Sequence, residues 1–406
     1  MTAPRKPARE NYDAVVGLDP NPDHKPQFAF ALVKFTFELT PSGLVPAPPE
    51  PLLFDVFNDP ELEPPLPPGS DYWFNKPATD VMVRGCAFSG SETAFRSMSV
   101  SVTVADRTKR VSVFGPRRVA WSAGGTPSFT EPELVEAVPL LYQLAYGGLD
   151  ARAPIPDAMA ADYDALLRAG MACDHPGLYP RNPVGRGYVA LPGPVEDLEL
   201  PLLEDPSDLL TPERLCAGSP QLWYRQPLPW CFEWLPGAMF PRCRYLGLDG
   251  WYPSPQGPEL PEVARSYLAP NLTQALKDRP QLMDAYLQEA SLGMTFAAPL
   301  AGKRVEIVSM HAQRPRIQFN FPPEPRVEME IEGQRESVHP RLINVVILPG
   351  ENRLMLTYAA KASPFSRVFI PGIHKLIPAS VSVNGDRPVH YETPPTVRER
   401  LRQTAG

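Results

Sequence analysis

The chain contains 54 prolines among its 406 residues, well over twice the usual share of about 5%. Proline has no backbone N–H to donate, and its fixed φ interrupts helices and central strands. A chain so rich in proline must therefore fold into short elements that are joined by stiff, extended connections. Long helices are excluded over most of its length.

Several segments show the alternation of apolar and polar residues that is typical of strands with one buried face. The alternation is clearest in residues 97–104, where Met98, Val100, Val102 and Val104 alternate with serine and threonine. The other predicted strands are residues 28–39, 81–86, 110–114, 305–310, 316–321, 327–331, 342–348 and 353–358, with residues 350–352 as a hairpin connection. We expect a mainly β protein of antiparallel sheets, of sandwich or open-barrel type, with a few short helices and long proline-rich ordered loops.

Helical spacing of apolar residues predicts two short helices, at residues 159–170 and 281–290. A third is expected to start at Pro139 and to end at Gly147 and Gly148, since glycine is common at helix C-caps. The predicted division of the chain is an N-terminal extension (1–24), a β-rich body with a helical and aromatic loop layer (25–296), a C-terminal β-rich subdomain (297–392) and a flexible tail (393–406).

Charge and cysteine usage restrict the partners and the compartment. A net charge of −7 argues against binding to a phosphate backbone, so no nucleic-acid partner is expected. No apolar run approaches the roughly 20 residues of a membrane-spanning helix, so no membrane insertion is expected. The five cysteines lack the spacing of a disulfide framework, and the first residues lack the apolar centre of a signal peptide. Reduced thiols in the cytoplasm are the simplest interpretation.

A search for catalytic and metal motifs gives little. The sequence has no G-x-S-x-G elbow, no P-loop and no G-x-G-x-x-G after a strand. Cys173 and His175 make half of a zinc-like pattern without a second pair. The sequence therefore predicts no catalytic residue, no metal and no cofactor. An active site that is assembled from distant residues stays open as an alternative.

Seven short blocks occur in a fixed order along the chain. They are residues 32–37 (LVKFTF), 76–81 (KPATDV), 113–117 (VFGPR), 139–142 (PLLY), 145–148 (AYGG), 181–188 (RNPVGRGY) and 200–206 (LPLLEDP). With these blocks the chain resembles the DUF2169 family over residues 25–360. The members of this family are encoded beside the spike proteins and effectors of type VI secretion systems.

The resemblance implies a non-enzymatic adaptor or chaperone in a bacterial cytoplasm. Such a protein would bind a type VI secretion effector and help to load it onto the spike, so its implied partners are the effector and the spike or tip proteins. Stiff loops on a β scaffold would suit this role, because a preorganised surface loses little entropy on binding. Two alternatives remain: an enzyme with hydrolase-type chemistry, and a fixed structural part of the injection apparatus.

Six residues are candidates for partner binding: Arg181, Asn182, Arg186, Tyr188, Lys76 and Trp234. Four of them also have a structural interpretation, which we favour. The two arginines would brace a loop through carbonyls or carboxylates, Lys76 would pair with Asp80, and the tryptophan would lie in the core. Gly185 and Gly187 are expected to adopt backbone dihedrals that other residues resist.

Overall fold

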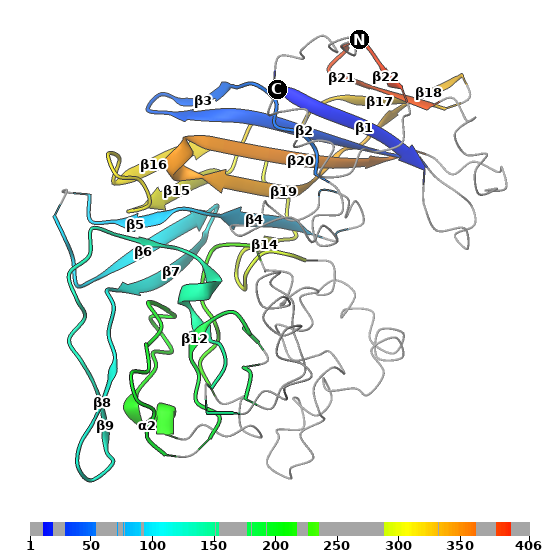
Figure 1. Ribbon diagram of the computed structural model, residues 1–406. Helices are drawn as coiled ribbons and strands as arrows, with labels where there is room; N and C mark the ends of the chain where they lie inside the picture. Colours follow the sequence, from blue (N-terminus) through cyan, green and yellow to red (C-terminus); the bar gives the residue numbers. More distant parts are fainter. Residues whose placement is uncertain are drawn as a thin grey trace, which may run out of the picture.

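A computed structural model describes residues 11–18, 29–53, 71, 76, 78–90, 93–150, 152–153, 177–179, 181–191, 193–216, 226–234, 288–331, 333–362 and 379–390 (Figure 1). Most of these residues lie in strands or in the short connections between them. Three larger sheets and three strand pairs make up the fold.

The largest sheet has the strand order β1-β2-β20-β19-β4-β14, and β3 pairs with the end of β2. Neighbouring strands are antiparallel except for β4 and β19, which run parallel. Its strands are β1 (Tyr12–Leu18), β2 (Ala29–Thr40), β3 (Gly43–Pro46), β4 (Thr79–Val83), β14 (Thr295–Phe296), β19 (Arg341–Leu348) and β20 (Arg353–Lys361).

Two smaller sheets accompany it. The five-stranded sheet has the order β13 (Leu203–Glu204), β7 (Arg107–Phe114), β6 (Ser97–Val104), β15 (Arg304–Val308) and β16 (Arg316–Asn320). The four-stranded sheet has the order β18 (Gln334–Val338), β17 (Val327–Ile331), β21 (Ala379–Val383) and β22 (Val389–His390).

Shorter elements complete the described chain. Three strand pairs are formed by β5 (Cys86–Phe88) with β10 (Ala137–Pro139), β8 (Val119–Trp121) with β9 (Pro127–Phe129), and β11 (Tyr146–Gly147) with β12 (Arg186–Gly187). The helical elements are α2 (Pro212–Cys216) and two 3-10 turns, η2 (Tyr142–Leu144) and η5 (Pro349–Glu351).

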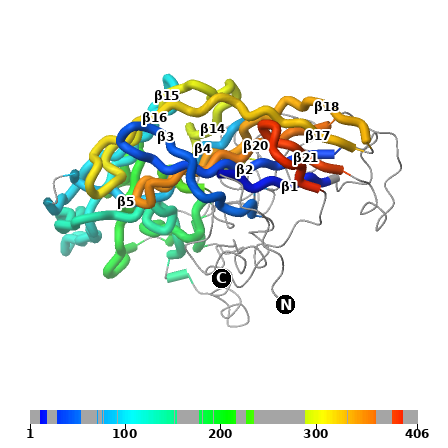
Figure 2. Tube along the Cα trace, turned by 90° about the horizontal axis from the view of Figure 1, so that it is seen from above, coloured from blue at the N-terminus to red at the C-terminus, as the bar shows by residue number. Residues whose placement is uncertain are grey.

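One hydrophobic cluster joins the three larger sheets. It contains Val33 and Leu356 of the largest sheet, Val100 and Ile307 of the five-stranded sheet, and Val381 of the four-stranded sheet. Figure 2 shows strands from both ends of the sequence side by side, and β2 pairs with β20 along nine residues. Strands from both sides of residue 297 share the two larger sheets, so distant parts of the chain together build the core.

The mainly β fold with antiparallel sheets is as predicted, and the sheets do not close into a barrel. Strand β6 has the predicted bounds, with Val100, Val102 and Val104 buried. The other predicted strands also form, with shifts of a few residues at their ends. The turn between β19 and β20 is confirmed as well, since Asn352 takes the left-handed conformation after η5. Strand β1 was not predicted.

The prediction of a helix between Pro139 and Gly148 is wrong. This segment contains the end of β10, the single turn η2 and strand β11. Tertiary partners replace the helical hydrogen bonds: the Glu233 carboxylate accepts from the Tyr142 N–H, and the Asn182 amide donates to the Tyr142 carbonyl. The helix predicted at 159–170 and most of the one at 281–290 lie outside the described residues.

Candidate functional site

A row of polar residues crosses the whole width of the largest sheet. The strand register places the following residues opposite one another in succession, one from each strand from β1 to β14: Asp13, Lys34, Thr357, Asn344, Asp80 and Thr295. Directly opposite residues lie on the same face of a sheet. This is the face that carries the small apolar cluster around Phe30 and Leu32, away from the main core. The four central members of the row are buried.

Lys76 inserts its ammonium group at the β4 end of this polar row. Its Nζ donates hydrogen bonds to Asp80 Oδ2 at 2.9 Å, Glu289 Oε2 at 2.5 Å and Asn344 Oδ1 at 2.6 Å. Lys76, Asp80 and Glu289 have no exposed surface. The three protons of the ammonium group thus all have acceptors. The predicted ion pair of Lys76 and Asp80 is confirmed, and it is part of a larger buried network.

A second buried cation lies nearer β1. The Lys34 ammonium donates to Asp71 Oδ2 at 2.9 Å and to the Pro51 carbonyl at 3.1 Å. Asp71 also accepts from the Thr357 hydroxyl and from the Leu53 N–H. Two buried cations, Lys34 in the polar row and Lys76 beside it, are thus each neutralised by carboxylates, which holds residues 51–53, 71 and 76 against the sheet.

The charges of the network act on Glu289 in opposite directions. Burial raises the pKa of Glu289 to about 7, against the attraction of the Lys76 ammonium, and the carboxylates of Asp80 and Asp71 add to the rise. For Lys76, burial lowers the pKa, but Asp80 and Glu289 outweigh it and the net pKa is raised. Lys76 is therefore charged at neutral pH, whereas Glu289 exchanges its proton near neutrality.

Replacing Glu289 with glutamine is expected to change how stability depends on pH between about 4.5 and 7. Because the glutamate pKa is higher in the folded than in the unfolded chain, the folded protein binds the extra proton in this window. Wild-type stability therefore falls as the pH rises, by at most about 1.4 kcal/mol per pH unit, through this one group. Urea denaturation of both proteins across the window measures the difference, which should grow in favour of Glu289→Gln with rising pH. A constant difference would contradict the assignment.

The 181–188 block forms a second buried site, beneath strand β11. Asn182 donates its amide to the carbonyls of Tyr142 at 2.8 Å and Tyr146 at 3.1 Å. Its own carbonyl accepts from the Gly148 N–H. Tyr188 is buried in a cluster with Tyr146 and Tyr179, whose ring centroids lie 5.0–6.4 Å apart. Asn182 and Tyr188 thus hold the loop together from inside.

The two glycines of the block differ from each other. Gly187 has a φ of +89°, as predicted. Gly185 is not among the residues with positive φ. The prediction that it adopts backbone dihedrals that other residues resist is therefore wrong. Its constraint is space instead, because a Cβ would lie 2.4 Å from the Asn182 amide nitrogen and 2.6 Å from the Ala145 carbonyl oxygen.

The remaining candidates also have structural partners. Arg186 donates to the Gln143 carbonyl at 3.2 Å and pairs with Glu199 at 2.8 Å, which is the predicted bracing role. Trp234 is buried with the Arg84 guanidinium 3.6 Å above its ring. Arg181 is half-buried and hydrogen bonds to Tyr179. Of the six candidates, only Arg181 and Arg186 keep partly exposed side chains.

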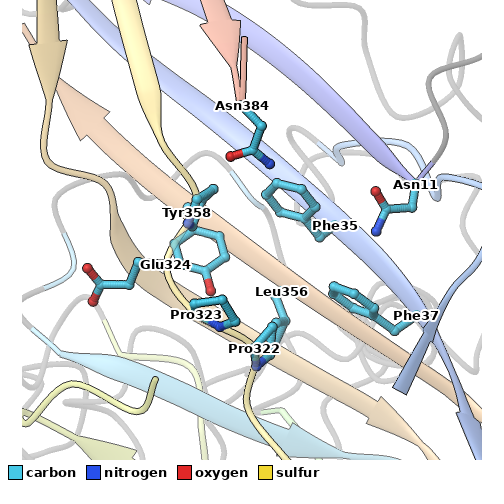
Figure 3. A pocket seen from close by; sticks show the side chains of 10 residues that line it. Asn11, Phe35, Phe37, Pro322, Pro323, Glu324, Leu356, Tyr358 and Asn384 are labelled. Carbon is cyan, nitrogen blue, oxygen red and sulfur yellow. The ribbon is translucent and has the colours of Figure 1, made fainter. Parts of the chain in front are cut away.

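An open groove lies on the other face of the largest sheet, where the four-stranded sheet joins it. We call it the aromatic groove; its volume is about 260 Å³. Phe35 and Phe37 of β2 and Leu356 and Tyr358 of β20 line it from the sheet (Figure 3). The Phe35 ring stacks on Phe37 at 6.4 Å and meets Tyr358 edge-on at 5.9 Å. The floor of the groove is therefore apolar and aromatic.

The connection from β16 to β17 forms the opposite wall of the aromatic groove. Pro322, Pro323 and Glu324 lie across the groove from the sheet, and Pro325 also lines it. Asn11 and Asn384 line the groove near Phe35. Three prolines with fixed φ make this wall stiff. The groove can bind an apolar group and can form hydrogen bonds with a peptide backbone. The four central residues of the polar row, in contrast, are buried.

Sequence reasoning missed most of these residues. Glu289 and Asn344 are 213 and 268 residues away from Lys76 in the chain. One local signal existed for Asn344, since it is a single polar residue inside the apolar run 342–348. Lys34 similarly interrupts an apolar run at 28–35. Glu289 gives no such signal in the sequence, because its role depends on Lys76, which only the fold brings close to it.

Two further observations concern metals and membranes. Among the described residues, no cluster of three or more His, Cys, Asp or Glu side chains is placed to hold a metal ion. Cys173 and His175 lie outside that part of the chain. A helix with the length and apolarity to cross a bilayer is not found in the described segments either.

Comparison with known proteins gives one match. Searches of curated proteins and of solved structures found none. A family model matches residues 24–359, with the description "Uncharacterized protein conserved in bacteria (DUF2169)". The match covers more than half of the chain and includes the polar row except Asp13, the 181–188 block and most of the aromatic groove. The chain therefore belongs to the DUF2169 family.

Proposed function

We propose that this protein is a non-enzymatic adaptor that binds an effector of a type VI secretion system in the bacterial cytoplasm and helps to load it onto the spike complex. The ordered sequence blocks that resemble family members encoded beside such effectors support this proposal. The observation that carries it is the contrast between the two faces of the largest sheet. On one face Lys34, Lys76, Asp80 and Glu289 are buried in structural networks, whereas the aromatic groove on the other face is open.

This contrast favours binding over catalysis for the described residues. A general acid or base must reach its substrate, but Lys76, Asp80 and Glu289 have no exposed surface. Apolar side chains in a preformed groove instead favour the contacts that dominate protein recognition. The stiff proline wall lowers the entropy that binding would cost.

A toxin gene adjacent to this one would support the proposal, and co-expression with its product tests it. The tagged protein should retain the toxin through size-exclusion chromatography in a fixed, near-stoichiometric ratio. Deleting the gene should lower the amount of toxin that is secreted, while the sheath still contracts. A toxin that is stable, secreted and active in the deletion strain would contradict the adaptor role. Retention of the protein with the sheath after firing would identify a fixed structural part instead.

A further inference from the structure

We infer that the aromatic groove binds an extended segment of a partner protein in which an apolar side chain stands next to a lysine or arginine. This inference rests on the proposed function, because the partner in question is the effector. It names the contact surface and the chemistry that the surface selects.

The dimensions of the groove favour a peptide over a small cofactor. Its volume of about 260 Å³ is below the range of roughly 300–1,000 Å³ that is usual for small-molecule pockets. Such a volume suits one or two side chains of a segment that continues beyond both ends. Phe37 is half-buried and Pro323 is exposed, so both walls are accessible from solvent.

The character of the floor selects an apolar side chain. Phe35, Leu356 and Tyr358 are buried beneath the groove, and the Phe35 and Tyr358 rings lock one another edge-on. A side chain that enters would cover Phe37 and the proline wall without moving these rings. Burial of apolar area on rigid aromatic groups is the main source of affinity in such contacts.

Charge complementarity selects the neighbouring residue. Glu324 is the one charged residue among the ten described residues that line the groove. The Glu324 side chain is 34% exposed, and the exposed His339 ring, which pairs with its carboxylate only when protonated, lies 3.8 Å away. The Glu324 charge also contributes, after burial, to the raised pKa of Tyr358, so it acts on the groove itself. A lysine or arginine beside the bound apolar group would meet this carboxylate.

Two side-chain amides of the groove offer contacts to a peptide backbone. Asn11 and Asn384 both line the groove near Phe35 (Figure 3). The side-chain carbonyl oxygen of Asn384 accepts a hydrogen bond from the Arg326 backbone N–H at 2.9 Å. This contact fixes the direction in which the side-chain amide nitrogen of Asn384 points. Side-chain amides both donate and accept, so they suit an extended segment with unpaired N–H and C=O groups.

Selection of random dodecapeptides displayed on phage tests the inference with the full-length protein immobilised. Wild-type protein should enrich peptides with an aromatic or aliphatic residue within two positions of a lysine or arginine, by about tenfold over the unselected library. Glu324→Lys should lower the enrichment of basic residues by roughly fivefold and favour acidic ones, because an attractive rim charge becomes repulsive. Phe37→Ser should abolish enrichment.

Matched controls separate the groove from general effects. Glu328→Lys makes the same charge change at an exposed position of β17 outside the groove, and Leu134→Ser removes an exposed apolar residue elsewhere. Both should select the wild-type peptides. Circular dichroism and thermal unfolding check that Phe37→Ser is folded, and Glu324→Lys changes only an exposed side chain.

The inference is overturned if wild-type protein enriches no such peptides, or if Glu324→Lys and Phe37→Ser select the same peptides as wild type. In that case toxin that still co-purifies with the protein would leave the adaptor role standing on another surface. If the peptides bind as expected but the toxin does not co-purify, the groove is a peptide site and the proposed function fails.

Discussion

Replacing Lys76 with methionine should lower the free energy of unfolding by about 3–5 kcal/mol, because it removes the cation of a buried ion network. Methionine fills most of the same space but carries no charge. The Asp80 carboxylate would then have no counter-charge, in a place that water does not reach. Glu289 would lose the same partner and would shift further toward its protonated form. Urea denaturation followed by tryptophan fluorescence measures the loss.

The matched control is Arg335→Met on β18. Arg335 forms an ion pair with Glu330 at 3.2 Å, but its side chain is 65% exposed. Its loss should therefore lower the free energy of unfolding by less than about 1 kcal/mol. A second comparison adds Asp80→Asn and Glu289→Gln to Lys76→Met. Removing the uncompensated charges should restore part of the stability. If Lys76→Met is no less stable than Arg335→Met, the ammonium group does not balance the network.

The position of this network explains why such a costly arrangement is compatible with the proposed adaptor role. Lys76 connects three distant parts of the chain: strand β4, strand β19 and the residues just before β14. An apolar core residue would tolerate several registers, whereas a buried ammonium group accepts only the register that supplies its three acceptors. The network therefore fixes the edge of the same sheet whose opposite face carries the aromatic groove.

Local patterns predicted what depends on local chemistry. The alternation in 97–104 predicted β6 with its buried face. This was possible because the alternating residues and the short turn to the pairing strand β7 lie in one segment of the sequence. The glycine and proline signals likewise predicted where strands end. Strand β1 was not predicted because the residues on either side of it in the sequence are polar or proline-rich, and its pairing partner β2 begins eleven residues after β1 ends.

The candidate site depended on long-range pairing and could be predicted only in part. Lys76 and Asp80 were close enough in sequence for their ion pair to be proposed, but Asn344 and Glu289 come from the other half of the chain. The aromatic groove needs the proline connection after β16 to pass over β20. Both the Lys76 network and the aromatic groove depend on how strands from distant parts of the chain pair with one another. No single segment of the sequence determines that pairing.

Gly147→Ala should lower the free energy of unfolding by roughly 2–4 kcal/mol, because the added methyl group would meet a fixed backbone oxygen at a residue with positive φ. Gly147 has a φ of +150°, and a Cβ there would lie 2.1 Å from the Asn182 carbonyl oxygen. That oxygen cannot move away, because it accepts from Gly148 and Gly185, and the Asn182 amide is held by two further carbonyls. Backbone strain contributes about 1 kcal/mol and overpacking about 1–3 kcal/mol.

Gly350→Ala is the matched control for Gly147→Ala, because a Cβ at Gly350 meets nothing within 4 Å and the residue is not among those with positive φ. It should be neutral within about 0.5 kcal/mol. Thermal unfolding of both variants measures the contrast, and equal stability would show that the 181–188 block is loose enough to yield. A stable Gly147→Ala protein that no longer binds the toxin would instead assign the block a direct role in the contact. We expect the opposite: the block loses binding only when it loses its fold, because its side chains hold strand β11 from inside.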